Sequence, residues 1–263
     1  MNRTRIAFFD SGMGGLTVMN MAIAAYPAAQ YIYYADIAHV PYGKKKKKQI
    51  RKYVKGAVEF LISKKIDILV IACNTATSVC IKELRRDYDL PIIGMEPAVK
   101  PAVKLLTQPQ QKILVCATKL TLKEKKLKDL ITNLEADDRT NLLSLQKLVA
   151  YAEKGNFKGK KVRKYLKQKF SDFDWKNYSA LVLGCTHFRY YIKLIRKMIP
   201  DHIAIIDGNT GTVNRLLHFL PELSAQEINV EPASIEVYFS SKQQNPASIQ
   251  PYLDFLNTNS QKS

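Results

Sequence analysis

The stretches ILVIACNTAT, residues 68–77, and ALVLGCTH, residues 180–187, decide how this chain folds. Each has a short apolar run, a small residue, a cysteine and then amide or hydroxyl side chains. Apolar runs of this length, bounded by polar residues, are typical of strands buried on both faces of a parallel sheet. Cys73 and Cys185 then each follow the carboxyl end of a strand, where open α/β sheets bind ligands. Two equivalent motifs predict a site with one thiol on each side.

Short apolar runs alternate with amphipathic segments through the rest of the chain, which predicts an α/β fold with parallel sheets. We expect a change of domain near residues 96–101, because the strand and helix pattern restarts after them. A lysine-rich helix is expected over residues 122–132 after a polar turn at 118–121, and another helix over 188–198. The tail from about Glu222 is expected to have one strand-like piece over residues 234–239 and a polar, frayed end. The lysine run at 44–48 is expected to open a helix that continues to about Lys64.

Composition limits the function classes. With 46% hydrophobic and 24% charged residues, the 263-residue chain is of ordinary globular type. No apolar run spans a bilayer, and no signal-peptide pattern opens the sequence, so we expect a cytoplasmic protein without membrane partners. The four cysteines form no CxxC pair, so no metal site is predicted, and Cys80 and Cys116 are expected to be buried core residues. The net charge of +18 predicts nonspecific attraction of nucleic acid, unless the lysines only cover solvated helix faces.

The glycine-rich turn DSGMGGLT, residues 10–17, opens a helix and allows a ligand or another backbone to come close. It nearly fits the dinucleotide fingerprint, although Thr17 replaces the third glycine, and Asp36 lies at about the right distance for a ribose contact. A nucleotide-dependent enzyme is therefore one hypothesis. The plainer alternative is that Asp10 or Ser11 caps the helix.

Two opposed thiols permit three kinds of chemistry. One is nucleophilic catalysis with His187 as the base, although that leaves the second cysteine unexplained. Another is redox pairing, for which no resolving partner is marked. The third is proton transfer, in which a thiolate removes a proton from one face of a carbon and a thiol returns one to the other face. Both cysteines precede predicted helices, whose positive ends favour a thiolate.

Four blocks together resemble the glutamate racemases of the aspartate/glutamate racemase family: residues 9–17, 36–43, 72–77 and 183–187. The resemblance implies cofactor-independent interconversion of L- and D-glutamate, which supplies D-glutamate for peptidoglycan in cell wall biogenesis and cell shape. It also implies two pseudo-symmetric α/β domains, each with a mainly parallel sheet flanked by helices, and an active site in the cleft between them. The first domain would comprise residues 1–97 plus about 208–263, and the second about 98–207. Members often self-associate, so a homodimer is one expectation.

The resemblance also assigns the catalytic residues. Cys73 and Cys185 match the two proton-transfer cysteines, and Asp10 matches a residue near the substrate ammonium and the first thiol. His187 matches the residue that assists the second thiol. Glu153 lies where the family often has a glutamate near that histidine, although it could equally be a surface residue.

The remaining matched positions bind substrate. A loop contacts it through backbone, and polar side chains bind its carboxylates and amine. These positions are Ser11, Pro41, Tyr42, Gly43, Asn74, Thr75, Thr118, Thr121 and Thr186, together with Asp10 and His187.

Some positions depart from the family pattern. His39 precedes Pro-Tyr-Gly where arginine is common, Phe188-Arg189 replaces Tyr-Pro, and five lysines open a helix that is usually mixed or acidic. Aspartate racemase is the nearest alternative, but the residues after the two cysteines, Thr77 and His187, favour glutamate. A non-catalytic, basic nucleic-acid-binding protein on a racemase fold is the other alternative.

Overall fold

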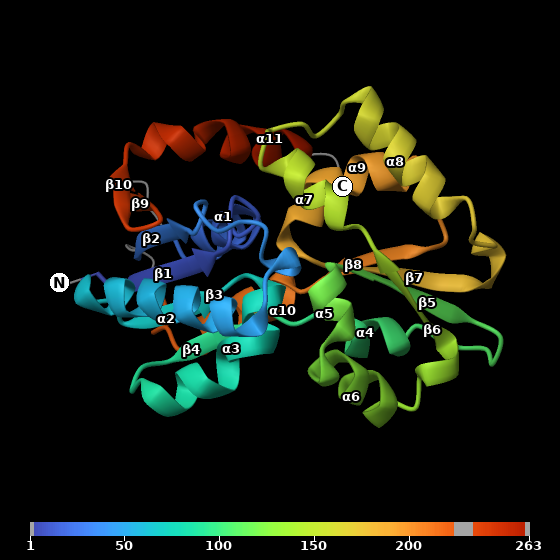
Figure 1. Cartoon of the computed structure of the whole chain (residues 1–263), viewed down its shortest axis with the longest axis horizontal. Helices are drawn as coiled ribbons and strands as arrows, with labels where there is room; N and C mark the ends of the chain where they lie inside the picture. The colour runs from blue at the N-terminus through green and yellow to red at the C-terminus, as the bar shows by residue number, and fades with distance from the viewer. Residues whose placement is uncertain (1–2, 224–233, 261–263) are drawn as a thin grey trace.

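The computed structural model describes residues 3–223 and 234–260 and consists of two lobes, each built on its own sheet (Figure 1). The first sheet has six strands in the order β10-β9-β2-β1-β3-β4, and the second has four in the order β6-β5-β7-β8. All neighbouring strands are parallel except β9 and β10. The strands are β1 Arg5–Asp10, β2 Gln30–Ala35, β3 Ile68–Ile71, β4 Ile92–Gly94, β5 Lys112–Ala117, β6 Thr140–Ser144, β7 Tyr178–Gly184, β8 Ala204–Asp207, β9 Ile235–Phe239 and β10 Lys242–Gln244.

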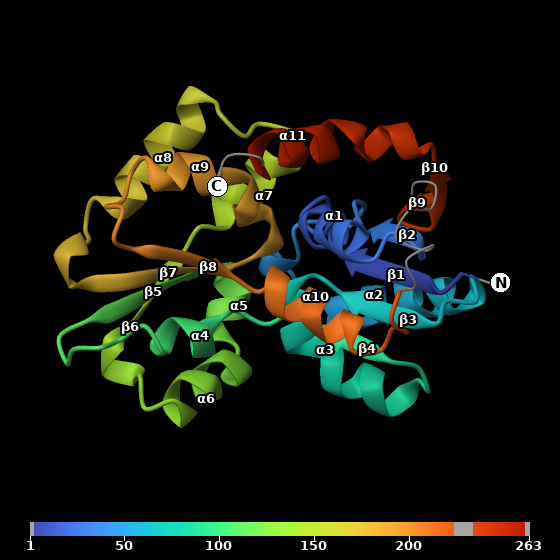
Figure 2. The same cartoon turned by 180° about the vertical axis from the view of Figure 1, so that it is seen from behind.

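Helices cover both faces of each sheet, as the view from behind also shows (Figure 2). The α-helices are α1 Leu16–Ala25, α2 Lys47–Ser63, α3 Asn74–Asp87, α4 Val99–Val103, α5 Lys119–Lys123, α6 Lys125–Asn133, α7 Gln146–Ala152, α8 Lys160–Phe170, α9 Ile192–Arg196, α10 Asn209–Leu217 and α11 Gln250–Ser260. Short 3₁₀ segments are η1 Tyr42–Lys44, η2 Asp137–Arg139, η3 Trp175–Asn177, η4 Thr186–Tyr191 and η6 Pro246–Ile249. Among the described residues, no helix combines the length and the apolar character that crossing a membrane requires.

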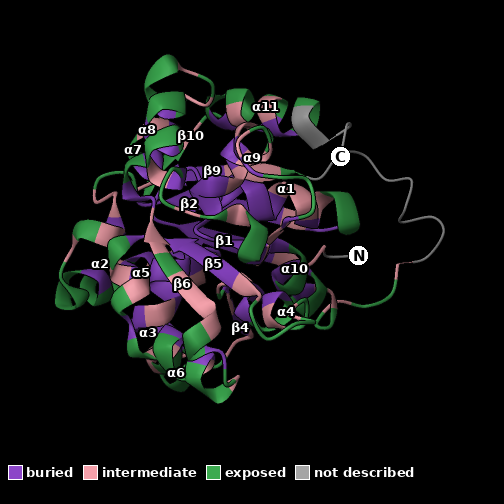
Figure 3. Ribbon diagram, turned by 90° about the vertical axis from the view of Figure 1, so that its right-hand side faces the viewer, coloured by how far each residue is buried: buried purple, intermediate pink, exposed green. Residues whose placement is uncertain are grey.

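The central strand β1 shows why the apolar runs form parallel strands. Ile6 and Phe8 pack on the face covered by α1, α10 and α11, whereas Ala7 and Phe9 pack on the opposite face, with α2 and α3. Every second residue therefore enters a different core, and a strand of this kind needs apolar side chains at consecutive positions. The strands are accordingly buried through the middle of the molecule (Figure 3).

The second sheet repeats this arrangement with β5 and β7. Val115 and Val182 lie in the core beneath α4 and α6, while Cys116 lies on the other face, in the core shared with the first lobe. Cys80 lies in the core between α2, α3 and the first sheet. Both cysteines are free and buried, as predicted, and burial raises the pKa of the Cys80 thiol to about 12. Burial also raises the pKa of Cys116.

Four local predictions were wrong. The predicted turn at 118–121 is the start of α5, capped by Thr118, and the predicted helix over 122–132 is broken. The break is at Glu124, where the backbone is extended and the buried carboxylate lies 2.9 Å from Lys47 Nζ. The lysine run does not itself begin a helix at residue 44, because residues 42–44 form η1 and α2 starts at Lys47. The segment after Cys185 is η4, six residues of 3₁₀ helix, followed by the short α9.

The strand predicted over residues 234–239 is β9, which pairs with β2 and so extends the first sheet. The start of the predicted tail, residues 224–233, lies outside the described residues, and the end of the chain is more ordered than predicted. Helix α11 then packs Leu253 and Leu256 against the core that contains α1. We propose that the domain boundaries lie near residues 97 and 207, because β1–β4, β9 and β10 share one sheet and β5–β8 share the other.

Candidate active site

The carboxyl ends of the central strands of the two sheets meet around one small cavity. Cys73 follows β3, Cys185 follows β7, and both line this cavity. Its volume is about 10 Å³, which is about the space that a single water molecule needs. The other lining residues are Ser11, Pro41, Tyr42, Gly43, Asn74, Thr75, Thr118, Gln146, Val149, Thr186 and His187.

Cys73 is held by groups of the first lobe. Its sulfur accepts a hydrogen bond from the Ala76 N–H at 3.5 Å, in the first turn of α3, and lies 3.7 Å from Ser11 Oγ. Burial is the main reason that the pKa of this thiol is raised, and the negative charge of Asp10 adds to the effect. The Ala76 N–H and Ser11 act in the opposite direction. The predicted influence of the helix start on this cysteine is therefore present but is outweighed by burial.

Cys185 has different neighbours. Its sulfur lies 3.7 Å from His187 Nδ1, and the other ring nitrogen of His187 is hydrogen-bonded to Glu153 Oε1. Burial opposes protonation of His187, but its bonds to Cys185 and Glu153 and the charge of Glu153 raise its pKa well above its usual range. The imidazole of His187 is therefore the group beside the Cys185 sulfur, where the sequence predicted the start of an α-helix and the structure has the 3₁₀ segment η4.

Glu153 does not line the cavity but contacts His187, which does, and it is not on the open surface. Its carboxylate accepts the Met13 N–H at 2.8 Å as well as the His187 bond, and Tyr252 of α11 donates to its backbone oxygen at 3.1 Å. The Met13 bond joins the two lobes, because Met13 belongs to the turn after β1 and Glu153 follows α7.

Asp10 lies at the end of β1 and is fully buried. Its carboxylate accepts the Gly12 N–H at 2.9 Å and the Thr186 hydroxyl at 3.0 Å, so it too joins the two lobes. Burial raises the pKa of Asp10 from 3.8 to about 6, although His187 and the Gly12 N–H pull it down. Asp10 is therefore a buried carboxylate whose charge acts on Cys73 and which bonds Thr186, the residue after Cys185.

Three of the four predicted threonines form a closed set of hydroxyls. The Oγ1 atoms of Thr75, Thr118 and Thr121 lie 3.0 Å from one another, which links α3 to the start of α5. Thr121 does not line the cavity itself but touches the two threonines that do.

Two amide side chains face the cavity with atoms that lack partners. Asn74 is buried, and neither atom of its amide group is hydrogen-bonded. Gln146 is also buried, with Oε1 accepting the Lys119 N–H at 3.3 Å and Nε2 unbonded. Gln146 was not predicted, because no motif surrounds it and only the fold brings the start of α7 to the cavity.

The loop before α2 lines the cavity with Pro41, Tyr42 and Gly43. The Tyr42 hydroxyl donates to Asp36 Oδ2 at 2.6 Å. Asp36 also bonds His39 and Ser240, so its oxygens are occupied by this loop and by the chain after β9. Asp36 is thus a structural carboxylate and not the ribose ligand of the nucleotide hypothesis.

The glycine-rich turn admits protein side chains from the second lobe. A methyl group at Gly12 would lie 2.1 Å from Glu153 Oε1, and one at Gly14 would lie 2.3 Å from Thr186 Oγ1. Tyr190 adds a hydrogen bond to the Met13 carbonyl at 2.8 Å. The turn needs glycine so that the lobes can close around it, and its N–H groups at residues 12 and 13 already bind carboxylates of the chain itself.

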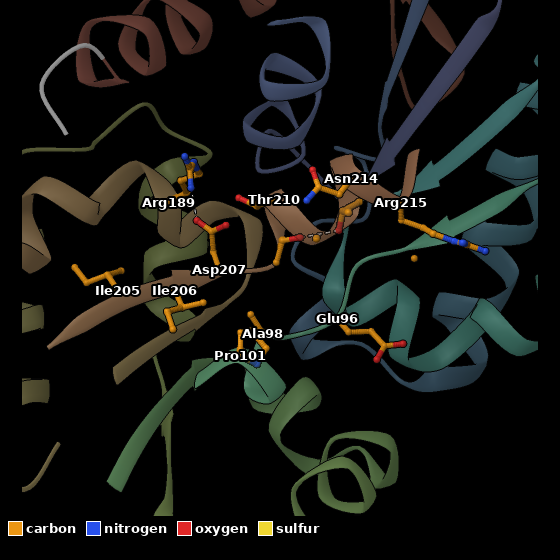
Figure 4. A pocket seen from close by; sticks show the side chains of 14 residues that line it. Glu96, Ala98, Pro101, Arg189, Ile205, Ile206, Asp207, Thr210, Asn214 and Arg215 are labelled. Carbon is orange, nitrogen blue, oxygen red and sulfur yellow. Dashed lines mark hydrogen bonds and ion pairs between the residues drawn. The ribbon is translucent and has the colours of Figure 1, made fainter. Parts of the chain in front are cut away.

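A larger cavity of about 610 Å³ lies elsewhere between the lobes, beside the two chain crossings (Figure 4). Arg189 and Asp207 form an ion pair on its wall, and Glu96 and Arg215 also line it. It contains none of the residues predicted for the site. Within residues 3–223 and 234–260, we find no cluster of three or more residues suited to hold a metal ion.

Residues 15–216 match the model of the Asp/Glu/Hydantoin racemase family. The chain belongs to this family. It is 47% identical over 252 residues to the glutamate racemase of Halothermothrix orenii, which covers 96% of this chain and 98% of that relative. The expected kinship with glutamate racemases, and with it the expected amino-acid racemase class of enzyme, is confirmed.

Solved structures confirm the two-domain racemase fold. The glutamate racemase of Campylobacter jejuni superimposes with a TM-score of 0.80 at 28% identity, covering 97% of this chain and 98% of that chain. The Escherichia coli enzyme, solved with L-glutamate and the activator UDP-MurNAc-ala, gives 0.79 at 25% identity, with 97% and 95% covered.

Proposed function

We propose that the chain is a cofactor-independent glutamate racemase that interconverts L- and D-glutamate and so supplies D-glutamate for peptidoglycan synthesis. The observation that carries this function is the pair of buried cysteines, one at a strand end of each sheet, lining one cavity. The high identity to curated glutamate racemases supports glutamate over the aspartate alternative. Both groups that exchange protons are side chains of the chain itself, so the reaction needs no cofactor.

The reaction on this proposal has two proton transfers. The thiolate of one cysteine removes the α-proton of glutamate, and the thiol of the other donates a proton to the opposite face of the resulting carbanion. One thiol is thereby formed and one thiolate is left, and the roles exchange for the reverse reaction. His187 exchanges a proton with Cys185, held in place by Glu153.

Asp10 has two proposed roles at the Cys73 side. It binds the substrate ammonium. The hydrogen bonds that its buried carboxylate accepts come from uncharged groups of Ser11, Gly12 and Thr186, so a cation would add a stronger partner. Its negative charge also helps to raise the pKa of Cys73. An ammonium beside Asp10 would offset that charge, so substrate binding itself would make the Cys73 thiolate easier to form.

The substrate carboxylates need hydrogen-bond donors. We propose that Asn74 and Gln146 donate to them, because both carry buried amide groups with free donors at the cavity. The hydroxyls of Ser11, Thr75, Thr118, Thr121 and Thr186, and the backbone of residues 41–43, complete the proposed binding set.

Closure of the lobes is part of the proposed mechanism. A cavity of about 10 Å³ cannot hold glutamate, so the lobes must separate to admit substrate and close again over it. The bonds Thr186–Asp10, Met13–Glu153 and Tyr190–Met13 would break and re-form in each cycle. Closing excludes water, which strengthens the hydrogen bonds that stabilise the carbanion.

The test is racemisation in D₂O without added cofactor, followed by circular dichroism and by uptake of deuterium at the α-carbon. We expect activity in the wild type and in Cys80→Ala, a matched control for loss of a buried thiol, and loss of racemisation in Cys73→Ser and Cys185→Ser. Racemisation that survives either serine variant would contradict the two-base mechanism. If aspartate reacts and glutamate does not, the mechanism stands and the substrate is wrong.

Three further features stay predictions. The sequence and the family resemblance predict that the protein acts in the cytoplasm and forms a homodimer. Light scattering of the purified protein tests whether it is a dimer. Nonspecific attraction of nucleic acid follows from the net charge of +18, and retention on DNA that falls with salt tests it. DNA retention in a protein that does not exchange the α-proton would favour the binding-protein alternative.

A further inference from the structure

A third cavity, of about 1000 Å³, adjoins the one that holds the thiols. The two share Gly43 and Gln146 in their walls, so these residues form the boundary between them. We call the larger one the mouth cavity. It lies between η1 of the first lobe and α5, β6, α7 and α8 of the second.

Four lysines line the mouth cavity, one from the first lobe and three from the second: Lys44, Lys119, Lys147 and Lys169. None of them forms an ion pair with any described residue, whereas Lys47 and Lys126 nearby are paired with Glu124 and Glu96. Asp172 is the one acidic residue among the described residues of the wall. The mouth cavity therefore carries an unneutralised positive charge.

Two buried polar groups in the wall also lack hydrogen-bond partners. They are Gln146 Nε2, on a side chain that is 6% exposed, and Ser144 Oγ. The Lys119 N–H fixes the oxygen of the Gln146 amide at 3.3 Å, which leaves the NH₂ group as the free end. A buried donor without a partner is unfavourable, so an anionic ligand that accepts its hydrogen bond would be stabilised here.

The positive charge of the mouth cavity and its position beside the thiol cavity both favour the glutamate substrate as its ligand. At neutral pH glutamate carries two carboxylates and one ammonium, so it is a net anion. The thiol cavity is too small to take it from bulk water without opening, and the mouth cavity touches that cavity at Gly43 and Gln146. A charged cavity of this kind raises the local concentration of an anion and its rate of entry.

We propose that the mouth cavity is the entrance to the active site, and that its lysines hold the carboxylates of the dicarboxylate substrate as the lobes open. This inference rests on the proposed function. It also gives a role to Lys44, the first residue of the lysine run at 44–48.

The test removes charge from the mouth cavity without touching the thiols. In the combined variant Lys44→Gln, Lys119→Gln and Lys147→Gln, the KM for glutamate should rise about five- to tenfold at low salt, with kcat within twofold of the wild type. The wild-type kcat/KM should fall as NaCl is raised from 10 to 300 mM, and this dependence should be much weaker in the variant. A merely structural role would lower kcat or thermal stability instead.

The matched control is the combined variant Lys52→Gln, Lys82→Gln and Lys104→Gln. These lysines are exposed, form no ion pair with a described residue and do not line the mouth cavity, and their loss changes the net charge equally. An unchanged KM in this control supports the proposal. If both variants raise KM alike, or if the mouth variant keeps the wild-type KM and salt dependence, the entrance is not there. A wild type that does not racemise glutamate overturns the proposed function, and this inference with it.

Discussion

Replacing Asp10 by asparagine should make the protein more stable and inactive. The Asp10 carboxylate accepts hydrogen bonds from the Gly12 N–H and from the Thr186 hydroxyl. Asparagine has nearly the same shape, and its amide can accept the Gly12 N–H and donate to Thr186 Oγ1. What the substitution removes is a negative charge that burial makes unfavourable in the folded protein. Because Asp10 is fully buried, solvent screening does not reduce this effect.

The magnitude follows from the pKa of Asp10, which burial raises from 3.8 to about 6. At about 1.4 kcal/mol per pH unit, this difference corresponds to a free energy of about 3 kcal/mol. The sign is that of an acid with a raised pKa, because the folded state holds the proton more tightly than the unfolded state does. The unfavourable contribution is absent below about pH 3.8, grows between that pH and about pH 6, and is complete above it. Asp10→Asn should therefore gain about 3 kcal/mol at pH 8 and about half of that at pH 5.

Urea unfolding of both proteins at pH 5 and pH 8 measures this difference in the free energy of unfolding. In thermal unfolding at pH 8, we expect a midpoint about 6 °C higher for the variant. Its racemase activity should be at least about 100-fold lower. Asp36→Asn is the control, since the Asp36 carboxylate accepts bonds from His39, Tyr42 and Ser240 and its loss should destabilise the protein. A variant Asp10→Asn that is less stable at pH 8, or whose gain is equal at both pH values, would refute the reasoning.

Three other changes test single contacts. Glu153→Gln should lower the pKa of His187, measured by NMR, and reduce kcat. The raised pKa of His187 stabilises the fold below about pH 6.5, and this stabilisation is lost as the pH rises through the folded-state pKa. The variant should therefore lose more stability at pH 6 than at high pH, and equal losses would contradict this. Gln146→Leu should raise the KM for glutamate about tenfold at similar kcat by removing a donor to a carboxylate, and an unchanged KM would exclude that role. Gly12→Ala should cut kcat more than about tenfold, because its methyl group meets Glu153. The control Gly56→Ala lies in open space inside α2, so it should keep activity and raise the free energy of unfolding by about 0.5–1 kcal/mol. Equal effects of the two changes on kcat would argue against closure at the turn.

Much of the fold was predictable because it depends on local patterns. The consecutive apolar residues of β1, β3, β5 and β7 predict buried parallel strands, and the cysteines follow two of them at the edge where ligands bind. Local patterns failed where a distant contact decides the structure. Glu124 breaks a helix of good local propensity by turning its buried carboxylate toward Lys47, and the polar tail becomes a helix because Leu253 and Leu256 find the core beside α1.

The site divides in the same way. The sequence by itself determined the residue types that carry the chemistry, two cysteines each followed by polar side chains, and the glycines of the turn. Only the tertiary structure decided their partners: Glu153 bonds His187, Thr186 bonds Asp10, and Gln146 reaches the thiol cavity. Asp10 and Thr186 are separated by 176 positions, and the spacing of residues along the chain holds no record of such a contact. Burial decides the rest, because packing removes Asp10 and Cys73 from water and thereby raises their pKa values.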